Sequence, residues 1–311
     1  MPIMINSDIM NAIRAHHAAQ VQIGEALALE HCVNINDESR GELHTSVAAA
    51  ARTMGFIEAD AQALAHAWCR QSERLGRFDA TVWPDHPADF GWSTPEAHQR
   101  FAPCPYRLGL YAVLPDAHWI ARMAQAGVPT LQLRFKSDDP QAIDREVQKA
   151  VRAVEGSASL LFINDHWQAA IEHGAYGVHL GQEDLQAEQA GLSRLRTAGL
   201  RLGLSTHGYA EMGIAAAVGP SYLALGAIYP TTLKRMATAP QGPGRLARYA
   251  RLAREFPQVA IGGIDADRMP QALASGVGSV AVVRALVAAS NPQAEAARLM
   301  AIIAQAGVGQ N

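Results

Sequence analysis

The sequence predicts an α/β protein built as a (β/α)8 barrel, the TIM-barrel fold, with a mainly helical extension before it. From about residue 108 onward, eight short apolar segments with strand character alternate with helical segments, as expected for a parallel barrel. The length of 311 residues accommodates one barrel of roughly 200–250 residues and a smaller region. An open doubly wound sheet is the main alternative. It would carry a glycine-rich loop after its first strand, where this chain has Leu114-Pro-Asp116.

Residues 1–107 form the predicted extension. Segments 8–28 and 45–74 are rich in alanine and repeat apolar residues with the period of a helix. Residues 34–41 between them are loop-like, and Pro and Gly interrupt regular structure from 77 to 105. The extension is therefore predicted to be a small helical region followed by an irregular linker.

The aromatic residues of the extension are expected to have structural roles. Trp83 and Trp92 are predicted to pin the linker against the barrel. His16 and His17 are adjacent in a predicted helix and face different directions, which favours a surface role over metal binding. Because no motif in residues 1–100 reaches the predicted site, we expect this region to be dispensable for the chemistry.

The barrel, residues 108–311, contains eight predicted strands, each followed by a helix. Active sites of such barrels lie at the C-terminal ends of the strands, and polar side chains collect there in this sequence. The predicted strands are 108–114, 130–136, 159–165, 177–181, 201–207, 222–228, 259–264 and 279–286. The predicted helices lie around 119–126, 142–154, 168–173, 187–198, 210–218, 244–255, 267–275 and 292–306.

Segment 130–136 differs from the other predicted strands, because polar residues occupy every second position. Gln132, Arg134 and Lys136 alternate with apolar residues, which sends the two sets to opposite faces. A half-exposed surface strand would show the same alternation, but strands of a parallel barrel are normally almost continuously apolar. Two cations and an amide at a strand end suit a phosphorylated ligand, because Arg binds phosphate bidentately and Lys acts as a point charge.

Two carboxylates, Asp165 and Asp184, follow neighbouring predicted strands. Such a pair can share one Mg²⁺ ion, which binds one or two carboxylates together with water and substrate phosphate oxygens. The polar residues of segment 130–136, with Asn164 and Lys234, would then surround a diphosphate bridged to that ion. The alternative is that the two aspartates cap the helices that follow them.

A second phosphate site is predicted at the ends of strands seven and eight. The segment Ile261-Gly-Gly-Ile264 and the segment 279–284 lie where barrels often bind phosphate through backbone N–H groups. Glycine permits the close approach of backbone to ligand. The rim is therefore expected to bind two phosphorylated substrates, or one substrate with two phosphorylated ends.

Charge and composition exclude several classes of function. The formal net charge is −3 and there is no basic tract, so nucleic acid is not an expected partner. The sequence has no run of about 18 apolar residues, so no membrane span is predicted. The N-terminus lacks the pattern of a signal peptide. The three cysteines show no metal-binding spacing and are expected to be reduced thiols of a cytoplasmic protein.

Six motifs in unbroken order, spread over residues 108–289, resemble the thiamine phosphate synthase family. They are Gln-Leu-Arg-Phe-Lys at 132–136, Ile-Asn-Asp at 163–165, Gly-Val-His-Leu-Gly-Gln-Glu-Asp at 177–184, Leu-Ser-Thr-His at 204–207, Pro-Thr-Thr-Leu-Lys at 230–234 and Ala-Ile-Gly-Gly at 260–263. The resemblance implies a (β/α)8 barrel and a transferase. Its reaction would join hydroxymethylpyrimidine diphosphate to a thiazole phosphate, giving thiamine phosphate and diphosphate.

The resemblance also implies roles for individual residues. The diphosphate would bind to Gln132, Arg134, Lys136, Asn164 and Lys234, and Mg²⁺ to Asp165 and Asp184. Ser205 would face the pyrimidine, and Thr231 with the backbone of Gly263, Val283 and Arg284 would hold the thiazole phosphate. Lys234, Arg134 and Ser205 are the residues expected to act in catalysis. The family is thought to release diphosphate first, after which the thiazole nitrogen captures a pyrimidine-methyl cation.

Three positions depart from the family pattern. Leu233 replaces a hydroxyl residue, Arg284 stands where many members have serine, and His166 stands where arginine is common. Leu233 is not expected to be a ligand, whereas Arg284 adds a cation near the thiazole phosphate. None of these changes removes the metal pair or the diphosphate lysine.

Alternatives to the transferase follow from the same residues. A thiazole tautomerase-like barrel would use His207 as a base, and a non-catalytic binding module of the thiamine pathway would need no intact rim. The Gln-x-Arg-x-Lys pattern and Asp184 argue against the tautomerase, and intact charged groups at five strand ends argue against the binding module. Segment 42–70 faintly resembles the last helices of a hydroxymethylpyrimidine phosphate kinase, without that kinase's glycine motif, and a plain docking region fits equally well. A homo-oligomer is compatible with the sequence, which does not determine the oligomeric state.

Overall fold

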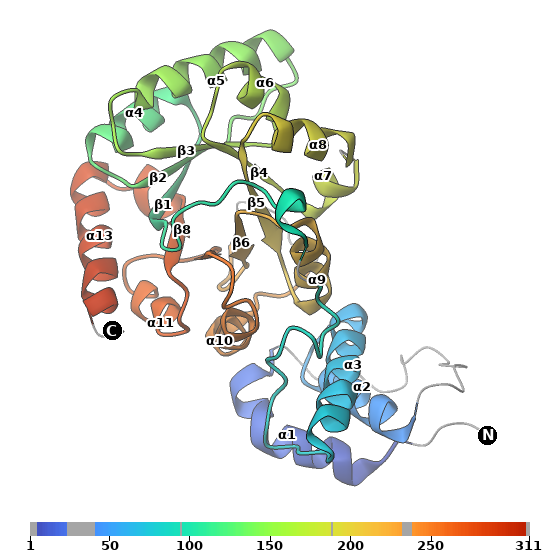
Figure 1. Ribbon diagram of the computed structural model, residues 1–311. Helices are drawn as coiled ribbons and strands as arrows, with labels where there is room; N and C mark the ends of the chain where they lie inside the picture. The colour runs from blue at the N-terminus through green and yellow to red at the C-terminus, as the bar shows by residue number, and fades with distance from the viewer. Residues whose placement is uncertain (1–4, 24–40, 94, 188, 232–237, 309–311) are drawn as a thin grey trace.

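The computed structural model describes residues 5–23, 41–93, 95–187, 189–231 and 238–308. Eight parallel strands pair in sequence order, and β1 pairs with β8, so the sheet closes into a barrel (Figure 1). The predicted (β/α)8 fold is therefore confirmed. The strands are β1 (Gly109–Leu114), β2 (Thr130–Leu133), β3 (Leu160–Asn164), β4 (Gly177–Leu180), β5 (Arg201–Thr206), β6 (Tyr222–Leu225), β7 (Gln258–Ala260) and β8 (Ser279–Val282).

Every strand ends at or before the predicted C-terminal boundary, and most end earlier. β3 stops at Asn164 because Asp165 has a φ of 64°, a left-handed conformation that turns the chain out of the sheet. β7 is followed by Gly262 and Gly263 at φ values of 101° and 65°. The predicted site residues thus lie in the last residues of the strands, such as Gln132 and Asn164, and in the loops that leave them, such as Arg134 and Asp165.

Helices surround the barrel in the predicted order. The largest difference is at 279–286, predicted as one strand, where β8 ends at Val282 and a short helix begins at Arg284. The barrel helices are α4 (Ala117–Gln125), α5 (Pro140–Val154), α6 (Trp167–Glu172), α7 (Gln182–Ala187), α8 (Gln189–Thr197), α9 (Tyr209–Val218), α10 (Gly242–Leu252), α11 (Met269–Leu273), α12 (Arg284–Val287) and α13 (Pro292–Val308).

The barrel interior is filled by aromatic side chains rather than left as a channel. Tyr111, Phe162 and Tyr222 are fully buried and contact one another, with ring centroids 5.2–6.0 Å apart. Gly203 makes room for them, since a Cβ there would lie 2.0 Å from the Tyr222 ring. This layer closes the barrel below the rim.

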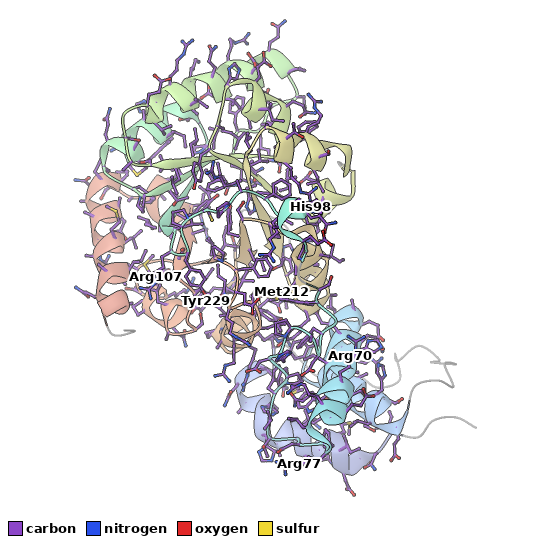
Figure 2. All side chains as sticks on the ribbon, in the orientation of Figure 1. Arg70, Arg77, His98, Arg107, Met212 and Tyr229 are labelled. Carbon is purple, nitrogen blue, oxygen red and sulfur yellow. The ribbon has the colours of Figure 1, made fainter. Side chains whose placement is uncertain are left out.

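In the residues that the structure describes, the extension contains the helices α1 (Ser7–Val21), α2 (Glu42–Thr53) and α3 (Glu58–Leu75), and its linker contains the 3-10 turn η2 (Ala97–Gln99). It lies beside α9 and α10 on one side of the barrel (Figure 1). Side chains fill this junction, where Met212 of α9 lies (Figure 2). One apolar cluster runs from the extension into the strand–helix layer of the barrel. The extension therefore shares a core with the barrel.

Single residues of the extension test two sequence expectations. Trp83 donates its Nε1–H to the Tyr209 hydroxyl at 2.9 Å, as expected for a residue that pins the linker to the barrel. The surface role expected for His17 is wrong. Its side chain is buried against Trp68 and Trp83, and its Nε2 lies 2.9 Å from the Ala80 carbonyl oxygen. In the described part of the chain, no helix is long and apolar enough to cross a membrane.

Candidate active site

Polar side chains meet at the C-terminal ends of β2 and β3. Gln132 is buried and donates its Nε2–H to Asn164 Oδ1 at 2.7 Å. Arg134 follows the last residue of β2, and its backbone N–H donates to the Leu114 carbonyl at 2.8 Å. Its side chain is half-buried. The strand pairing therefore brings the amides of Gln132 and Asn164 together beneath the loop that carries Arg134.

Lys136 and Asp165 form an ion pair in this region, with Lys136 Nζ 2.7 Å from Asp165 Oδ2. The left-handed backbone of Asp165 directs its carboxylate toward this lysine, and the α6 helix that follows has no side-chain cap. The helix-capping alternative for Asp165 therefore finds no support. Phe135 lies between Arg134 and Lys136 in the sequence. Its carbonyl oxygen lies 2.9 Å from His166 Nε2 and accepts a hydrogen bond from it.

Asp184 lies near Asp165, although the two come from different strand ends. Burial raises the pKa of the Asp184 carboxyl, and the negative charge of Asp165 raises it further, while Lys136 opposes the shift. Its Oδ2 accepts the Gly181 N–H at 3.1 Å, at the start of α7. Asp184 is therefore the third residue of α7, and it bonds back to the residue before the helix rather than capping a helix that follows it. The two predicted carboxylates are brought together, as the sequence indicated.

A hydrogen-bonded chain that the sequence analysis did not identify supports Ser205. His179 Nε2 lies 2.8 Å from Ser205 Oγ, and its Nδ1 lies 2.7 Å from the Tyr222 hydroxyl. Tyr222 in turn lies 2.7 Å from the Tyr111 hydroxyl, and burial raises the pKa of both phenols. The available signal was one histidine inside an otherwise apolar strand, β4. Its partners come from β5 and β6, which sequence spacing does not reveal.

The loops after β6, β7 and β8 form the other half of the rim. Tyr229 donates its backbone N–H to the Gly262 carbonyl at 2.9 Å, and Arg268 donates to the Gly263 carbonyl at 2.7 Å. A Cβ at Gly263 would lie 2.6 Å from the Pro230 carbonyl oxygen, so the two loops touch through backbone. Thr231 is half-buried in this region. Thr232, Leu233 and Lys234 lie outside the described residues.

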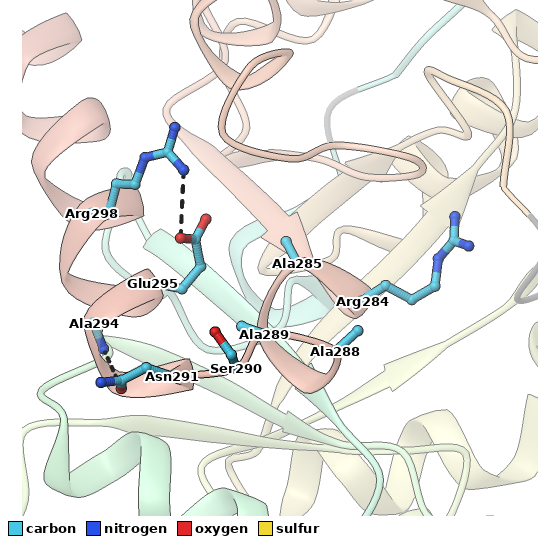
Figure 3. A pocket seen from close by; sticks show the side chains of 9 residues that line it. All are labelled: Arg284, Ala285, Ala288, Ala289, Ser290, Asn291, Ala294, Glu295 and Arg298. Atoms are coloured by element: carbon cyan, nitrogen blue, oxygen red, sulfur yellow. Dashed lines mark hydrogen bonds and ion pairs between the residues drawn. The ribbon is translucent and has the colours of Figure 1, made fainter.

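An open pocket of about 510 Å³ lies beside the end of β8, between α12 and α13. Arg284, the first residue of α12, lines it, and its side chain points away from the Arg298–Glu295 ion pair (Figure 3). Val283 is the residue that connects β8 to α12. Val283 and Arg284 therefore directly follow the C-terminal end of β8, and their contact with the thiazole phosphate stays a prediction.

The described residues include no group of three or more His, Cys, Asp or Glu side chains placed to hold a metal ion. Asp165 and Asp184 fit a hard cation because both offer carboxylate oxygens and burial with mutual repulsion disfavours two negative charges there. With two carboxylate ligands from the protein, the remaining coordination positions of the ion would be filled by water and substrate oxygens. This is the pattern of Mg²⁺ sites that bind phosphates.

Comparison with known proteins relates residues 110–286 to a family model described as thiamine monophosphate synthase. The chain is 53% identical over 194 residues to the thiamine-phosphate synthase of Neisseria meningitidis serogroup A, covering 62% of this chain and 94% of that protein. It is 49% identical over 209 residues to that of Enterobacter sp. strain 638, covering 67% and 97%.

Among solved structures, the thiamine phosphate pyrophosphorylase from Pyrococcus furiosus matches with a TM-score of 0.56 at 23% identity. The match covers 64% of this chain and 96% of that one. At this identity the likeness supports the barrel fold alone. The matched family segment begins at residue 110, so the extension lies outside it.

Proposed function

The chain belongs to the thiamine monophosphate synthase family, and we propose that it joins 4-amino-5-hydroxymethyl-2-methylpyrimidine diphosphate to a thiazole phosphate. It is a transferase, and in the proposed reaction the methylene carbon moves from diphosphate oxygen to the thiazole nitrogen. The carbon–oxygen bond breaks with its electron pair on the diphosphate, and the nitrogen lone pair forms the new carbon–nitrogen bond. The products are thiamine phosphate and diphosphate.

The observation that carries this proposal is the convergence of Gln132, Asn164, Lys136, Asp165 and Asp184 at adjoining strand ends. The first two offer amide groups and the third an ammonium beside two carboxylates. A diphosphate leaving group needs this mixture, because its charge grows as the carbon–oxygen bond breaks. Preorganised donors then bind the transition state more strongly than the ground state.

Individual residues have distinct roles in this proposal. Lys136 and Arg134 bind phosphate oxygens, while the buried Gln132–Asn164 pair orients the amide donors below them. Lys234 supplies an ammonium to the same diphosphate from the loop after β6. Ser205, held by His179, contacts the pyrimidine. None of these residues acts as a nucleophile, since the reaction proceeds by departure of the leaving group.

Asp165 and Asp184 would hold Mg²⁺, and their oxygen donors fit this ion. When bound, the ion would neutralise charge on the diphosphate. Lys136 would then exchange its bond to Asp165 for a phosphate oxygen. This exchange costs little, because an ion pair in which the lysine is 59% exposed contributes modestly to stability.

The thiazole phosphate would bind on the opposite half of the rim. Backbone N–H groups around Gly263 and Val283, with the Thr231 hydroxyl, provide neutral donors, and Arg284 adds a positive charge. The contact between the β6 and β7 loops supports this arrangement, because it holds backbone of both loops close to one another. The two phosphorylated groups would therefore bind at separate places.

Mass spectrometry can test the proposed reaction directly. The full-length protein is incubated with both substrates and Mg²⁺, and formation of thiamine phosphate is followed with time. A reaction without the thiazole phosphate serves as the control. A folded protein that forms no thiamine phosphate would overturn the proposal.

The comparisons lend no support to the tautomerase or binding-module alternatives.

Cytoplasmic location is also part of the proposal. Cys69 and Cys104 are free thiols, which agrees with a reducing compartment. Burial raises the pKa of the Cys104 thiol to about 11, so this cysteine is inert at neutral pH.

A further inference from the structure

The first turn of α9 is capped by a residue of the extension rather than by a residue of the barrel. The helix begins after Gly208, which has no side chain to cap it. Asp60, in the first turn of α3, accepts the Ala210 N–H through Oδ1 at 3.0 Å. The Asp60 side chain is 3% exposed, so this hydrogen bond is shielded from water. A carboxylate at a helix N-terminus also interacts favourably with the helix dipole.

Gly208 makes this contact sterically feasible. A Cβ at this position would lie 2.0 Å from Asp60 Oδ2. Its φ of 173° is extended backbone that any residue can adopt, so the reason for glycine here is space and not conformation. The barrel thus omits a side chain where the extension inserts a carboxylate.

The capped turn lies directly after the part of β5 that faces the pyrimidine. His207 and Gly208 connect Thr206, the last residue of β5, to α9. Glu211 accepts the His207 N–H at 2.9 Å, and its Oε2 also lies 2.7 Å from His207 Nδ1. Two carboxylates, one from the barrel and one from the extension, therefore fix this turn. Ser205 is only two residues before His207.

The barrel binds the extension in return through α10, the helix after the β6 loop. Arg245 is buried and donates to the carbonyls of Val21 and Met54, at the ends of α1 and α2, at 2.8 Å each. Its guanidinium also stacks on Phe56, 3.5 Å from the ring centroid. The extension is therefore held to both helices that follow the β5 and β6 loops.

We infer that the extension positions the active-site rim, and that Asp60 is a positioning residue that fixes the β5–α9 turn behind Ser205. This inference rests on the proposed function, which places Ser205 at the pyrimidine. It replaces the expectation that residues 1–100 are dispensable for the chemistry. That expectation considered only motifs that reach the substrate, and Asp60 acts through the backbone of another element.

Three variants test this inference. Asp60→Ala removes the acceptor, and Asp60→Asn keeps an oxygen at the same place. Glu58→Ala, two residues earlier on α3, removes the carboxylate that accepts from Arg52 and Gln62, both of the extension, and serves as the matched control. Steady-state kinetics with each substrate varied, and hydrogen exchange of the peptide covering 207–216, are measured at a temperature where all variants are folded.

We expect Asp60→Ala to lower kcat/KM for the pyrimidine diphosphate by about 10- to 100-fold, as displacement of a catalytic element does. The KM for the thiazole phosphate should change by less than about twofold, because that group binds at β7 and β8. Exchange at the start of α9 should accelerate. Asp60→Asn and Glu58→Ala should resemble the unchanged protein in both measurements.

Three outcomes would overturn the inference. One is unchanged kinetics in folded Asp60→Ala, and a second is an equal loss of kcat/KM in Glu58→Ala. A third is a rise of more than about twofold in the KM for the thiazole phosphate. If Asp60→Ala does not fold, Gly208→Ala displaces the carboxylate instead. It should lower kcat/KM for the pyrimidine diphosphate and leave the KM for the thiazole phosphate nearly unchanged. Wild-type kinetics in Gly208→Ala would also overturn the inference. An inactive wild-type protein would instead contradict the proposed function.

Discussion

The ion pair between Lys136 and Asp165 joins a lysine that is 59% exposed to an aspartate that is 27% exposed. Such a pair typically stabilises a protein by about 0–1 kcal/mol, because solvent screens the charges. Stability therefore does not explain why two opposite charges are kept at a strand end. A bound ligand explains the pair, because phosphate oxygens can bind the Lys136 ammonium while a cation binds the Asp165 carboxylate.

Replacing either carboxylate should raise the magnesium requirement. We expect Asp165→Asn or Asp184→Asn to shift the Mg²⁺ concentration for half-maximal activity upward by about tenfold or more, because one of two anionic ligands becomes neutral. Activity is measured across a magnesium titration. Asp267→Asn, at a side chain that is 94% exposed, serves as the control. Full activity of the unchanged protein in excess chelator would contradict the assignment.

Lys234 is one of three lysines in the chain. Lys234→Ala should lower kcat by roughly 100- to 1000-fold, because one preorganised donor to the leaving group is lost. Lys234→Arg should rescue only part of the rate, since a planar guanidinium does not replace a point charge. Steady-state kinetics provide the measurement, and the KM for the thiazole phosphate should change little.

Lys149→Ala is the matched control for this prediction. Lys149 lies on the outer helix α5, and its Nζ lies 3.5 Å from Glu146 Oε2 in a solvent-exposed ion pair. Its replacement should change kcat by less than about twofold, as exposed substitutions usually have small effects. Equal kcat values for the Lys234→Ala and Lys149→Ala proteins would remove Lys234 from the site.

At the scale of elements, the loops after the strands carry the site while the strands fix its positions. β4, β5 and β6 place His179, Ser205 and Tyr222 side by side, and the buried hydroxyl of Tyr111 completes the chain. Hydrogen bonds of this kind are costly to break, because the remaining groups stay buried without partners. The barrel interior thus supports the floor of the site.

Tyr222→Phe should reveal this support as a loss of stability. The change removes one hydroxyl and leaves His179 Nδ1 and the Tyr111 hydroxyl without this partner, so we expect a decrease of about 1–3 kcal/mol in the free energy of unfolding. Urea denaturation at neutral pH measures it. Tyr106→Phe, which removes an exposed hydroxyl bonded to the Arg254 carbonyl, should cost less. Equal losses would argue against the buried chain.

At the scale of the whole molecule, the extension and the barrel form one packed unit. Their interface contains a buried carboxylate, Asp60, and a buried guanidinium, Arg245. Burial raises the pKa of Asp60 to about 6, and the charge of Glu211 adds to the rise. Arg245 and the Ala210 and Tyr209 N–H groups oppose it. Tyr249 also lies close enough to interact with this carboxylate.

The raised pKa of Asp60 predicts a pH dependence of stability. The unfolded carboxyl titrates near pH 4, so between about pH 4 and 6 the folded protein binds more protons at Asp60 than the unfolded chain does. The contribution of Asp60 to the free energy of unfolding therefore falls as pH rises through this window.

Denaturation of the unchanged protein and of Asp60→Asn at several pH values isolates this contribution. The stability of the unchanged protein relative to Asp60→Asn should decline from pH 4 to pH 6 and then level off. The difference between the two proteins cancels the titration of all other groups to a first approximation. A difference that is constant with pH would show that Asp60 has an ordinary pKa.

Much of the barrel could be predicted from local sequence. Alternating strand and helix patterns gave eight strands in the correct order, because periodicity depends on which residues must be buried. The predicted strand ends were too long, as at 279–286, since apolar residues continue from β8 into α12. Periodicity reports burial and does not distinguish a strand from the short helix that follows it.

The sequence by itself determined the fold class and predicted which residues lie at the rim. Motif spacing places each polar residue at a strand end, and a closed barrel brings all strand ends to one face. Only the tertiary structure decided which residues from distant segments meet, as His179 meets Tyr222 and Asp60 meets Gly208. These contacts depend on the packing of one element against another. No local periodicity records such packing, because each partner alone resembles an ordinary buried or surface residue.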